Sequence, residues 1–347
     1  MEIADLLIFA VERHASDLHI SAHMPPMIRL NGDIRKLGVP PLSAKEVQDM
    51  VYDIMNDRQR KVFENEFEVD FSFEINNLGR FRVNVFQQSK GIAGVFRVIP
   101  TNARTLDDIG IPETFKLLLQ EPRGIILVTG PTGSGKSTTL AAMLNEINEN
   151  LQGHIITLED PIEFIHQNKK CIIHQRELGE HTLSFSAALR ASLREDPDVI
   201  LVGEMRDLET IRLALTAAET GHLVLSTVHT SSAPKTIDRI VDVFPAGEKE
   251  LVRTMLAESL RAIVAQVLVK TADGQGRAAA LEIMLGTPAI RNLIRENKIA
   301  QLYSMMQAGQ ALGMKTLDQA LVELVKQNKI NAAEAKMHAV QKSAFSV

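Results

Sequence analysis

Residues 124–147, GIILVTGPTGSGKSTTLAAMLNEI, constrain the fold of this chain more than any other stretch. A short aliphatic run leads into a glycine-rich loop of the pattern G-x-x-x-x-G-K-S, and helix-forming residues follow it. In this setting the glycines let backbone N–H groups turn toward phosphate oxygens, and the helix N-terminus adds a positive dipole. The sequence therefore predicts a phosphate-binding loop at the end of a strand in an α/β sheet.

The side chains of this loop predict a site for ATP and Mg²⁺. Lys136 would neutralise the β- and γ-phosphates, and the Ser137 hydroxyl would ligate Mg²⁺. A chance glycine turn at a helix start is the alternative, but it does not account for the strand, the Lys-Ser pair and the helix together. The predicted nucleotide-binding residues are Gly130, Pro131, Thr132, Gly133, Ser134, Gly135, Lys136, Ser137 and Thr138.

Residues 1–100 have the pattern of a small α+β domain. The chain begins with a short amphipathic helix, and Asn31-Gly32 is a two-residue hairpin turn between apolar strands. Ser43 and Glu46 form a capping box that opens a second helix. The apolar residues beyond it alternate with polar ones, which predicts an antiparallel meander.

The remaining residues have a different pattern. Residues 101–112 have the proline-containing, polar composition of an interdomain linker. In residues 113–347 short aliphatic strands alternate with helical segments, which predicts a mostly parallel sheet covered on both faces. From about residue 245 we expect mainly helices, including 248–269 and 315–327. A chain of 347 residues fits two domains, and we predict an α/β fold with a smaller N-terminal α+β domain.

Composition excludes several classes of protein. A net charge of −5 and a pI near 6.1 give no overall basic surface for nucleic acid. The single cysteine, Cys171, excludes an internal disulfide and fits the cytosol. Together with His166 and His174 it matches no standard zinc spacing, so we predict no structural metal. With no export signal and no long apolar run, we expect a cytoplasmic protein that reaches a membrane only through a partner.

An acid stands at the end of a second predicted strand, DPDVILVGE. Nucleotide-hydrolysing enzymes often have two acids there, but here Gly203 takes the first place and Glu204 the second. Because ligands of open α/β sheets bind at this edge, Glu204 is a candidate general base for the attacking water. The alternative is a loop acid that caps the next helix, but Asp207 can cap that helix itself.

A third predicted strand ends in the acid-rich turn TLEDPIE. Its acids, Glu159, Asp160 and Glu163, repel one another in the absence of a cation, and a Mg²⁺–water shell would relieve that repulsion. Acid-rich turns are also common as solvated surface, so the residues leave both interpretations open. The candidate Mg²⁺ ligands, partly through water, are Ser137, Glu159 and Glu163, and Glu163 is also a candidate catalytic residue.

Histidines flank a fourth strand, LVLSTV. His229 follows the strand and could donate to the γ-phosphate and sense its loss, although a lone histidine is more often a packing or capping residue. His222 precedes the strand and is a weaker candidate. Arg190 and Arg194 share a predicted helix face and could sense phosphate or pair across subunits, with a solvated basic face as the alternative.

Two arginines lie on predicted strands of the N-terminal domain. Arg82 faces away from its apolar neighbours, and Arg97 alternates in step with Val95 and Ile99. A guanidinium there needs an anion, either a protein carboxylate or a phosphate. If the anion is phosphate, both residues could act as arginine fingers.

Together these motifs resemble the secretion-type ATPases, and most closely the type IV pilus retraction motors. The resemblance covers nearly the whole chain, through SDLHI, NGD, GPTGSGKST, TLEDPIE, LREDPDVILVGEMRD, VHT and GTPAIRNLIREN. It implies a PAS-like N-terminal domain joined to a RecA-like ATPase domain in a homo-hexameric ring. The ring would hydrolyse MgATP to disassemble pilin and drive twitching motility, beside an inner-membrane platform protein at the base of the pilus machine.

The resemblance also assigns roles to residues. Gly203 belongs to the family's second acidic motif, and Glu159, Asp160 and Glu163 match its acid-rich box. The histidine box contains His222 and His229, and Arg82 and Arg97 match N-terminal arginines that reach the nucleotide. Residues 289–296, AIRNLIRE, match the retraction motif.

The sequence departs from the family pattern in two places. Its single cysteine cannot build the four-cysteine zinc insertion of many extension and type II relatives, and VHTSSA lacks the asparagine that many relatives have after HT. The alternatives to a retraction motor are an accessory nucleotide-binding ring, an extension or secretion ATPase, and a DNA translocase. The acidic balance and the absence of tryptophan argue against the translocase, so we expect no nucleic-acid partner.

Overall fold

The computed structural model describes residues 2–30, 32–76, 78–99, 103–274 and 276–345. The chain divides into two compact units, one comprising Met1–Asn102 with the segment Glu163–Ile165, the other Ala103–Ile162 with His166–Val347. Each unit has its own hydrophobic core. Among the described helices, none has the length and apolar character needed to cross a membrane.

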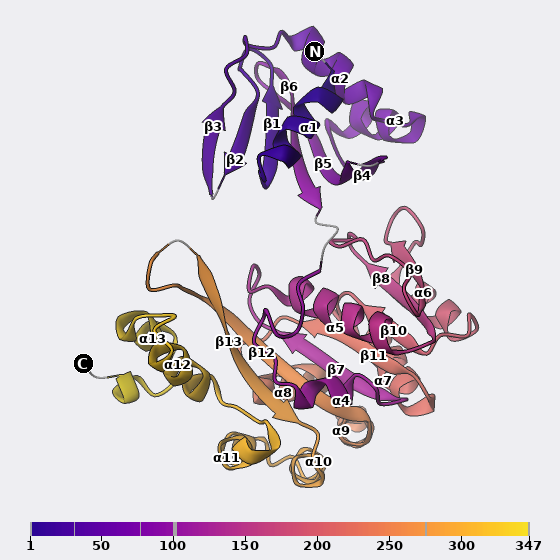
Figure 1. Ribbon diagram of the computed structural model, residues 1–347. Coiled ribbons are helices and arrows are strands. Elements are labelled where there is room, and N and C mark those ends of the chain that lie inside the picture. Colours follow the sequence, from indigo (N-terminus) through magenta and orange to yellow (C-terminus); the bar gives the residue numbers. More distant parts are fainter. Residues whose placement is uncertain (1, 31, 77, 100–102, 275, 346–347) are drawn as a thin grey trace. The chain divides into compact units, whose positions relative to one another are not determined.

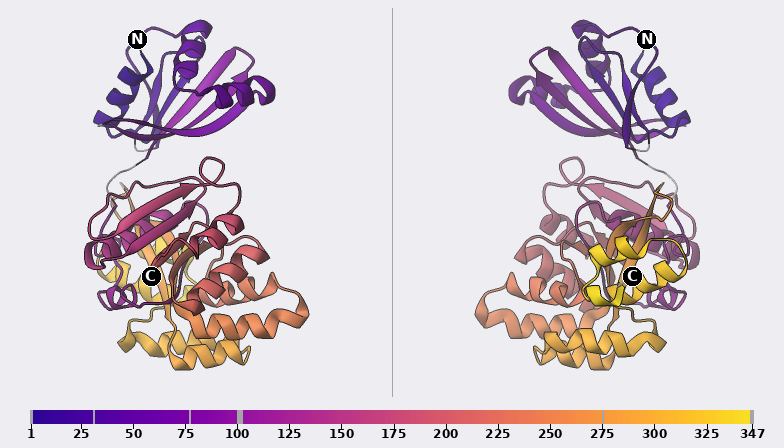
Figure 2. Two further views of the ribbon diagram at one scale, coloured as in Figure 1. Left: turned by 90° about the vertical axis from the view of Figure 1, so that its right-hand side faces the viewer. Right: turned by 90° about the vertical axis from the view of Figure 1, so that its left-hand side faces the viewer.

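The N-terminal unit is an antiparallel sheet with helices on one face (Figures 1 and 2). Its described strands have the order β3-β2-β1-β6-β5-β4. The elements are α1 (Ile3–Glu12), β1 (Asp17–Ser21), β2 (Met27–Leu30), β3 (Asp33–Lys36), α2 (Ala44–Asp53), α3 (Asp57–Glu66), β4 (Glu68–Ile75), β5 (Gly79–Gln88) and β6 (Gly91–Ile99).

Local signals in the N-terminal sequence explain these elements. Ser43 Oγ accepts from Glu46 N at 3.2 Å and Ser43 N donates to Glu46 Oε2 at 2.7 Å, so the predicted capping box opens α2. Strands β2 and β3 form the predicted hairpin, with Gly32 at φ +95°; Asn31 lies outside the described residues. Along β5, buried residues alternate with more exposed ones, because one face of the sheet packs against the helices.

The second unit is built on a sheet whose described strands have the order β13-β12-β7-β11-β10-β8-β9. Strand β13 is antiparallel to β12, and all other neighbours in this sheet are parallel. Helices α4 and α5 pack on one face, and α6 to α10 on the other. The predicted α/β class, with a smaller α+β unit, is confirmed.

The strands and helices around this sheet follow in chain order. They are α4 (Thr114–Leu118), β7 (Gly124–Thr129), α5 (Lys136–Asn150), β8 (His154–Glu159), β9 (Ile172–Glu177), α6 (Phe185–Ser192), β10 (Val199–Val202), α7 (Leu208–Thr220), β11 (Leu223–Val228), α8 (Ala233–Asp242), α9 (Lys249–Ser259), β12 (Leu260–Lys270) and β13 (Arg277–Leu285).

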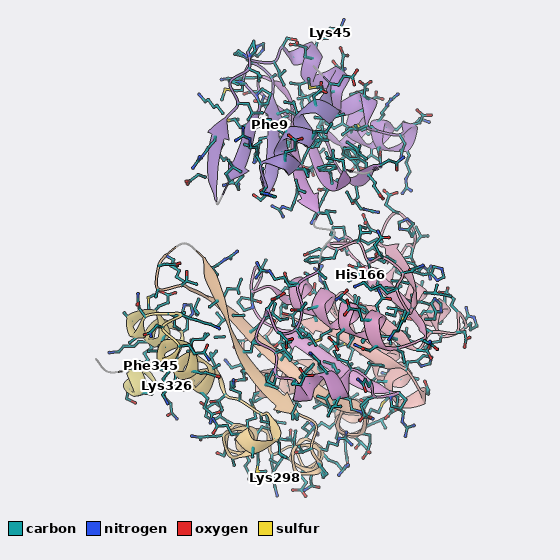
Figure 3. The ribbon with its side chains drawn as sticks, viewed as in Figure 1. Phe9, Lys45, His166, Lys298, Lys326 and Phe345 are labelled. Carbon is teal, nitrogen blue, oxygen red and sulfur yellow. The ribbon has the colours of Figure 1, made fainter. Side chains whose placement is uncertain are left out.

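The C-terminal helices are α10 (Pro288–Arg295), α11 (Leu302–Ala308), α12 (Leu317–Lys326) and α13 (Ala332–His338). Helices α12 and α13 pack on β13 and β12 and bury a small separate core with Val269 and Leu321. Phe345, labelled in Figure 3, closes this core near the C-terminus.

One expectation about a segment was wrong, and the structure adds detail to another. Most of the segment predicted as a linker, 101–112, groups with the second unit, where Leu106 and Ile111 are buried in the core that includes α5. The predicted helix over 248–269 ends at Ser259, and the rest is strand β12. Since β12 is covered on both faces, its apolar residues do not alternate with polar ones, and the run resembled a buried helix.

Candidate active site

The phosphate-loop motif lies between β7 and α5, as predicted from the sequence. Gly135 has φ +89° and is the N-cap residue of α5, a conformation that side chains with a Cβ rarely adopt. At Gly130 a Cβ would lie 2.4 Å from the carbonyl oxygen of Gln266 on β12. Gly135 is therefore required by its backbone conformation, and Gly130 by the close approach of β12.

The lysine of the loop is held by the loop itself. Lys136 is 9% exposed, and its Nζ donates to the carbonyl oxygens of Gly130 at 3.0 Å and Pro131 at 3.1 Å. The Ser134 hydroxyl is buried and has no hydrogen-bond partner among the described residues. A phosphate oxygen would be a stronger acceptor for Lys136 than the two neutral carbonyls are, because hydrogen bonds between ions are the stronger ones, and it could also accept from the Ser134 hydroxyl.

The other predicted residues of this unit meet the loop at one edge of the sheet. Strands β7, β11, β10 and β8 are consecutive parallel neighbours, so their carboxyl ends share an edge. The phosphate loop follows β7, His229 follows β11, Glu204 lies two residues beyond β10, and Glu159 ends β8. Helix α5 packs against β7 and β11 (Figure 1).

Glu204 is held between two basic side chains. Its Oε2 accepts from Arg206 Nη2 at 2.7 Å, and its Oε1 lies 3.3 Å from His229 Nε2. Burial favours the neutral form of the Glu204 carboxyl, but the hydrogen bond from Arg206 and the charge of His229 outweigh burial and lower its pKa. Glu204 is therefore ionised at neutral pH, which a proton acceptor requires.

Contacts at the end of β8 explain why residue 203 is a glycine. Gly203 N donates to Leu158 O at 2.7 Å, and a Cβ at this position would lie 3.1 Å from that oxygen. An acid cannot fit there without moving β8. Asp207 accepts from Thr210 N at 2.9 Å and caps α7, so Glu204 is not needed as the helix cap.

The acid-rich turn is supported from the edge strand β9. Glu159 Oε1 accepts from Thr157 Oγ1 at 2.6 Å and Gln175 Nε2 at 3.2 Å. Glu177, in register with Glu159, is 4% exposed, and its Oε2 accepts from Ile162 N at 3.2 Å. Glu163 is exposed and begins the segment that groups with the N-terminal unit.

The N-terminal arginines lie opposite each other, on the face of their own sheet that points away from the described helices of this unit. Arg82 on β5 is in register with Arg97 on β6, and Arg97 is in register with Asp17 on β1. Arg97 Nε donates to Asp17 Oδ1 at 3.0 Å while the Arg97 side chain stays 64% exposed. The anion beside Arg97 is thus a carboxylate, but this bond uses Nε, and the terminal amino groups of the guanidinium can bind another anion.

Other candidates lie away from the carboxyl edge. His222 precedes β11, at the opposite end of that strand from His229, and its Nδ1 lies 3.1 Å from Ala217 O. Arg190 pairs with Glu209 at 2.5 Å on the surface, and Arg194 Nη1 donates to Arg190 O at 3.2 Å. These contacts favour a surface role for the two arginines.

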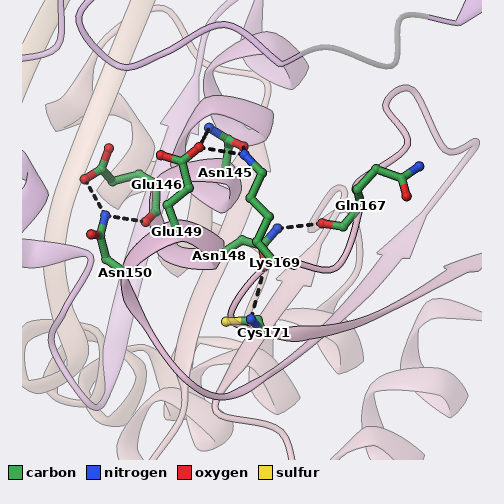
Figure 4. Close-up of polar contacts among 8 residues, drawn as sticks. All are labelled: Asn145, Glu146, Asn148, Glu149, Asn150, Gln167, Lys169 and Cys171. Atoms are coloured by element: carbon green, nitrogen blue, oxygen red, sulfur yellow. Dashed lines mark hydrogen bonds and ion pairs between the residues drawn. The ribbon is translucent and has the colours of Figure 1, made fainter.

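The segment around the cysteine is ordered by a buried asparagine of α5 (Figure 4). Asn148 Oδ1 accepts from Lys169 N and Cys171 N, and its Nδ2 donates to Gln167 O. Burial raises the pKa of the Cys171 thiol and lowers the pKa of His166, labelled in Figure 3, to about 4. Across the described ranges, no group of three or more His, Cys, Asp or Glu side chains could hold a metal ion.

Three residues that contact the site have no role in the motifs predicted from the sequence. Arg206 lies within VGEMRD, where its charge two positions after Glu204 is a usable signal. Gln266 on β12 also has a usable signal in the sequence, because it is a polar residue within an apolar run. Glu177 had no signal in the sequence, because β9 itself was not predicted.

Comparison with known proteins identifies the family. A family model described as type II/IV secretion system protein matches residues 2–345. The chain belongs to this family. It is 60% identical, over 97% of both chains, to the type IV pilus retraction ATPase PilT of Pseudomonas aeruginosa. It is 59% identical to a twitching motility protein of Neisseria gonorrhoeae, over 94% of this chain and 87% of that protein.

A solved structure in the same family has the same fold. The crystal structure of the pilus retraction motor PilT with bound ADP superposes with a TM-score of 0.93 at 46% sequence identity, covering 99% of this chain and 98% of that one. The family resemblance inferred from the motifs is therefore confirmed, as is the class of fold, a RecA-like ATPase with a smaller N-terminal domain.

Proposed function

We propose that this chain is a motor ATPase that hydrolyses MgATP to drive type IV pilus retraction. One observation supports this function most. The phosphate loop and the Glu204–His229 pair lie at the same edge of the parallel sheet, at the ends of neighbouring strands. The relatives named above share this sequence over nearly its full length and are described by retraction and twitching motility. The chain is accordingly an ATPase.

Nucleotide binding would exchange the partners of the phosphate loop. Lys136 would leave the carbonyls of Gly130 and Pro131 for the phosphates, which attract its charge more strongly. Mg²⁺ takes few protein ligands beside water and phosphate oxygens, which fits the hydroxyl of Ser137 with Glu159 and Glu163 acting partly through water. When bound, the ion would supply positive charge to the phosphate oxygens.

Glu204 would orient the attacking water and accept its proton. The carboxylate is ionised but engaged by Arg206, so we expect Arg206 to release Oε2 when water binds. His229 would then lie between the carboxylate and the γ-phosphate, where its donor can bind either anion. Loss of the γ-phosphate would leave Glu204 as the remaining anionic partner of His229, which makes His229 a sensor of hydrolysis.

The N-terminal unit would supply cations to the transition state. Arg82 and Arg97 would act as arginine fingers, so nucleotide occupancy would bias the arrangement of the two units and convert hydrolysis into movement. We propose an N-terminal PAS-like domain at 1–100, a linker at 101–112 and an ATPase domain at 113–347. The protein would act as a cytoplasmic homo-hexamer, peripheral to the inner membrane and bound to the platform protein of the pilus machine.

Steady-state phosphate release by the purified full-length chain tests the enzymatic part. We expect Mg²⁺-dependent release that is lost in Lys136→Ala and kept in Lys170→Ala, which removes an exposed lysine. ATP binding without phosphate release would favour an accessory ring instead.

A deletion strain tests the direction of movement. Surface filaments that persist but are no longer withdrawn support retraction. Cells without filaments would indicate an extension ATPase.

A further inference from the structure

Gln266 lies beside the phosphate loop but belongs to none of the motifs described above. It is on β12, which pairs with β7 so that Ala265 stands opposite Thr129, the last residue before the loop. Gln266 is therefore level with the start of the loop. The residue is 5% exposed, and the other buried residues of β12 are all apolar.

Both polar atoms of the Gln266 side chain form hydrogen bonds, one with the backbone of the phosphate loop and one with a side chain in the first turn of α5. Nε2 donates to the carbonyl oxygen of Ser134 at 2.5 Å, and Oε1 accepts from Thr139 Oγ1 at 2.8 Å. These partners fix the orientation of the amide, because the flipped amide would place oxygen against the Ser134 carbonyl. One side chain of β12 thus ties down the loop and the start of α5 together.

The bond to Ser134 has a consequence for phosphate binding. In a planar trans peptide the C=O and the following N–H point in opposite directions. Because Gln266 draws the Ser134 carbonyl toward β12, the N–H of Gly135 points away from β12. Phosphate loops bind their ligand through backbone N–H groups turned inward in this way. Thr139 N donates to Gly135 O at 3.0 Å, so the second bond of Gln266 braces the next peptide, Gly135–Lys136, from the helix side.

We propose that Gln266 is a positioning residue of the nucleotide site, which holds the Ser134–Gly135 peptide and the first turn of α5 in the phosphate-binding conformation before nucleotide arrives. This inference rests on the proposed function, since it requires that the loop binds nucleotide. A purely structural role is the alternative, in which the amide satisfies buried polar groups and affects fold stability alone.

Gln266→Met is the variant that separates these roles, because methionine keeps the unbranched shape and removes both hydrogen bonds. Equilibrium binding of a fluorescent ADP analogue to the full-length chain is measured together with kcat, KM for ATP and the nucleotide-free melting temperature. We expect Kd and KM to rise about tenfold, the effect of leaving a buried carbonyl unpaired, while kcat at saturating ATP changes less than about threefold.

Val264→Ala is the matched control for stability. Val264 is buried on the same face of β12 and in register with Val128, but it lies outside the loop contacts. Its truncation should lower the melting temperature and leave Kd unchanged. If Gln266→Met gives the wild-type Kd, or if both variants raise Kd in proportion to their loss of melting temperature, the positioning role is wrong.

A second substitution covers the case in which Gln266→Met does not fold. Gln266→Glu keeps the acceptor for Thr139 but sets a carboxylate oxygen against the Ser134 carbonyl, so Kd should rise more than tenfold. A wild-type Kd in this variant also overturns the inference. Failure of the wild-type chain to bind nucleotide would instead overturn the proposed function.

Discussion

The two sheets of this molecule differ in how many of their faces are covered by helices, and therefore in where their candidate functional residues lie. The N-terminal sheet is antiparallel, and the described helices of its unit pack on one face; the opposite face, called the open face below, carries Arg82 and Arg97. The second sheet is covered on both faces, and its candidate residues Glu204 and His229 stand where strands end. A one-sided sheet can present chemistry on its face, whereas a sheet buried on both sides can present it only at an edge.

This difference suggests a division of roles between the units. The edge of the parallel sheet would bind the nucleotide and direct the water, and the face of the antiparallel sheet would supply mobile cations. Substitutions at the edge should therefore separate binding from turnover within one unit. Substitutions on the open face should change turnover while the binding site itself stays intact.

The largest effect is expected from the double variant Arg82→Ala, Arg97→Ala. Removal of arginine fingers should lower kcat about 10⁴-fold, because developing phosphate charge loses its cations, while ADP affinity stays within about threefold. Steady-state phosphate release measures the first quantity and equilibrium binding the second. Arg35→Ala, which removes an exposed arginine of β3 in the same unit, is the control and should keep wild-type turnover. Near-normal turnover in the double variant would mean that the open face has no part in hydrolysis.

Glu204→Gln should lower kcat about 10³-fold, because an amide cannot accept the proton of the attacking water. ATP should still bind, and the trapped complex should be detectable in a nucleotide-retention assay. Glu209→Gln is the control, since Glu209 is an exposed acid at the start of α7, paired with Arg190. Phosphate release at the wild-type rate in Glu204→Gln would mean that Glu204 is not the general base.

Gly203→Ala tests the close packing at the end of β10. The new Cβ would lie 3.1 Å from Leu158 O, and we expect unfolding free energy to fall by about 1–2 kcal/mol. Gly247→Ala is the matched control, because a Cβ there meets nothing within 4 Å. Chemical denaturation measures both variants. Equal stabilities would show that the glycine is not required by its contact with β8.

Arg206→Ala should give the smallest effect, visible in the pH profile. Arg206 lowers the pKa of Glu204 below its ordinary value of 4.5, so the carboxylate stays ionised to more acidic pH. Without Arg206 the pKa rises, and the acid limb of the kcat/KM profile should shift to higher pH. Arg190→Ala, a surface arginine away from the site, should leave the limb in place. An unshifted limb in Arg206→Ala would mean that Arg206 does not control Glu204.

Local signals predicted the part of the fold nearest the phosphate loop. Strand β7 begins and ends at the residues expected, because the aliphatic run and the glycine loop are contiguous in sequence. Strand β9 was missed, since an edge strand carries few apolar residues and IIHQRE does not repeat any clear period. The predicted parallel sheet places Glu159, Glu204 and His229 at the carboxyl ends of its strands, as the structure does. Their catalytic roles stay predictions.

Contacts between distant residues could not be inferred from the sequence. Thr139 and Gln266 are 127 positions apart, and Arg97 and Asp17 are 80 positions apart, yet each pair is joined by a hydrogen bond. Such partners depend on strand order, which periodicity does not determine. For this reason the sequence leaves the anion beside Arg97 open between a protein carboxylate and a phosphate, and it gives Gln266, within its apolar run, no predicted role.

The most direct test of the central claim is a crystal structure of the Glu204→Gln chain with Mg²⁺ and ATP. We predict that the Arg82 and Arg97 guanidinium groups of an N-terminal unit lie within hydrogen-bond distance of the nucleotide phosphates in at least one site of the assembly. A structure in which both guanidinium groups lie far from the phosphates at every occupied site would contradict a motor driven by the closing of two units on one nucleotide.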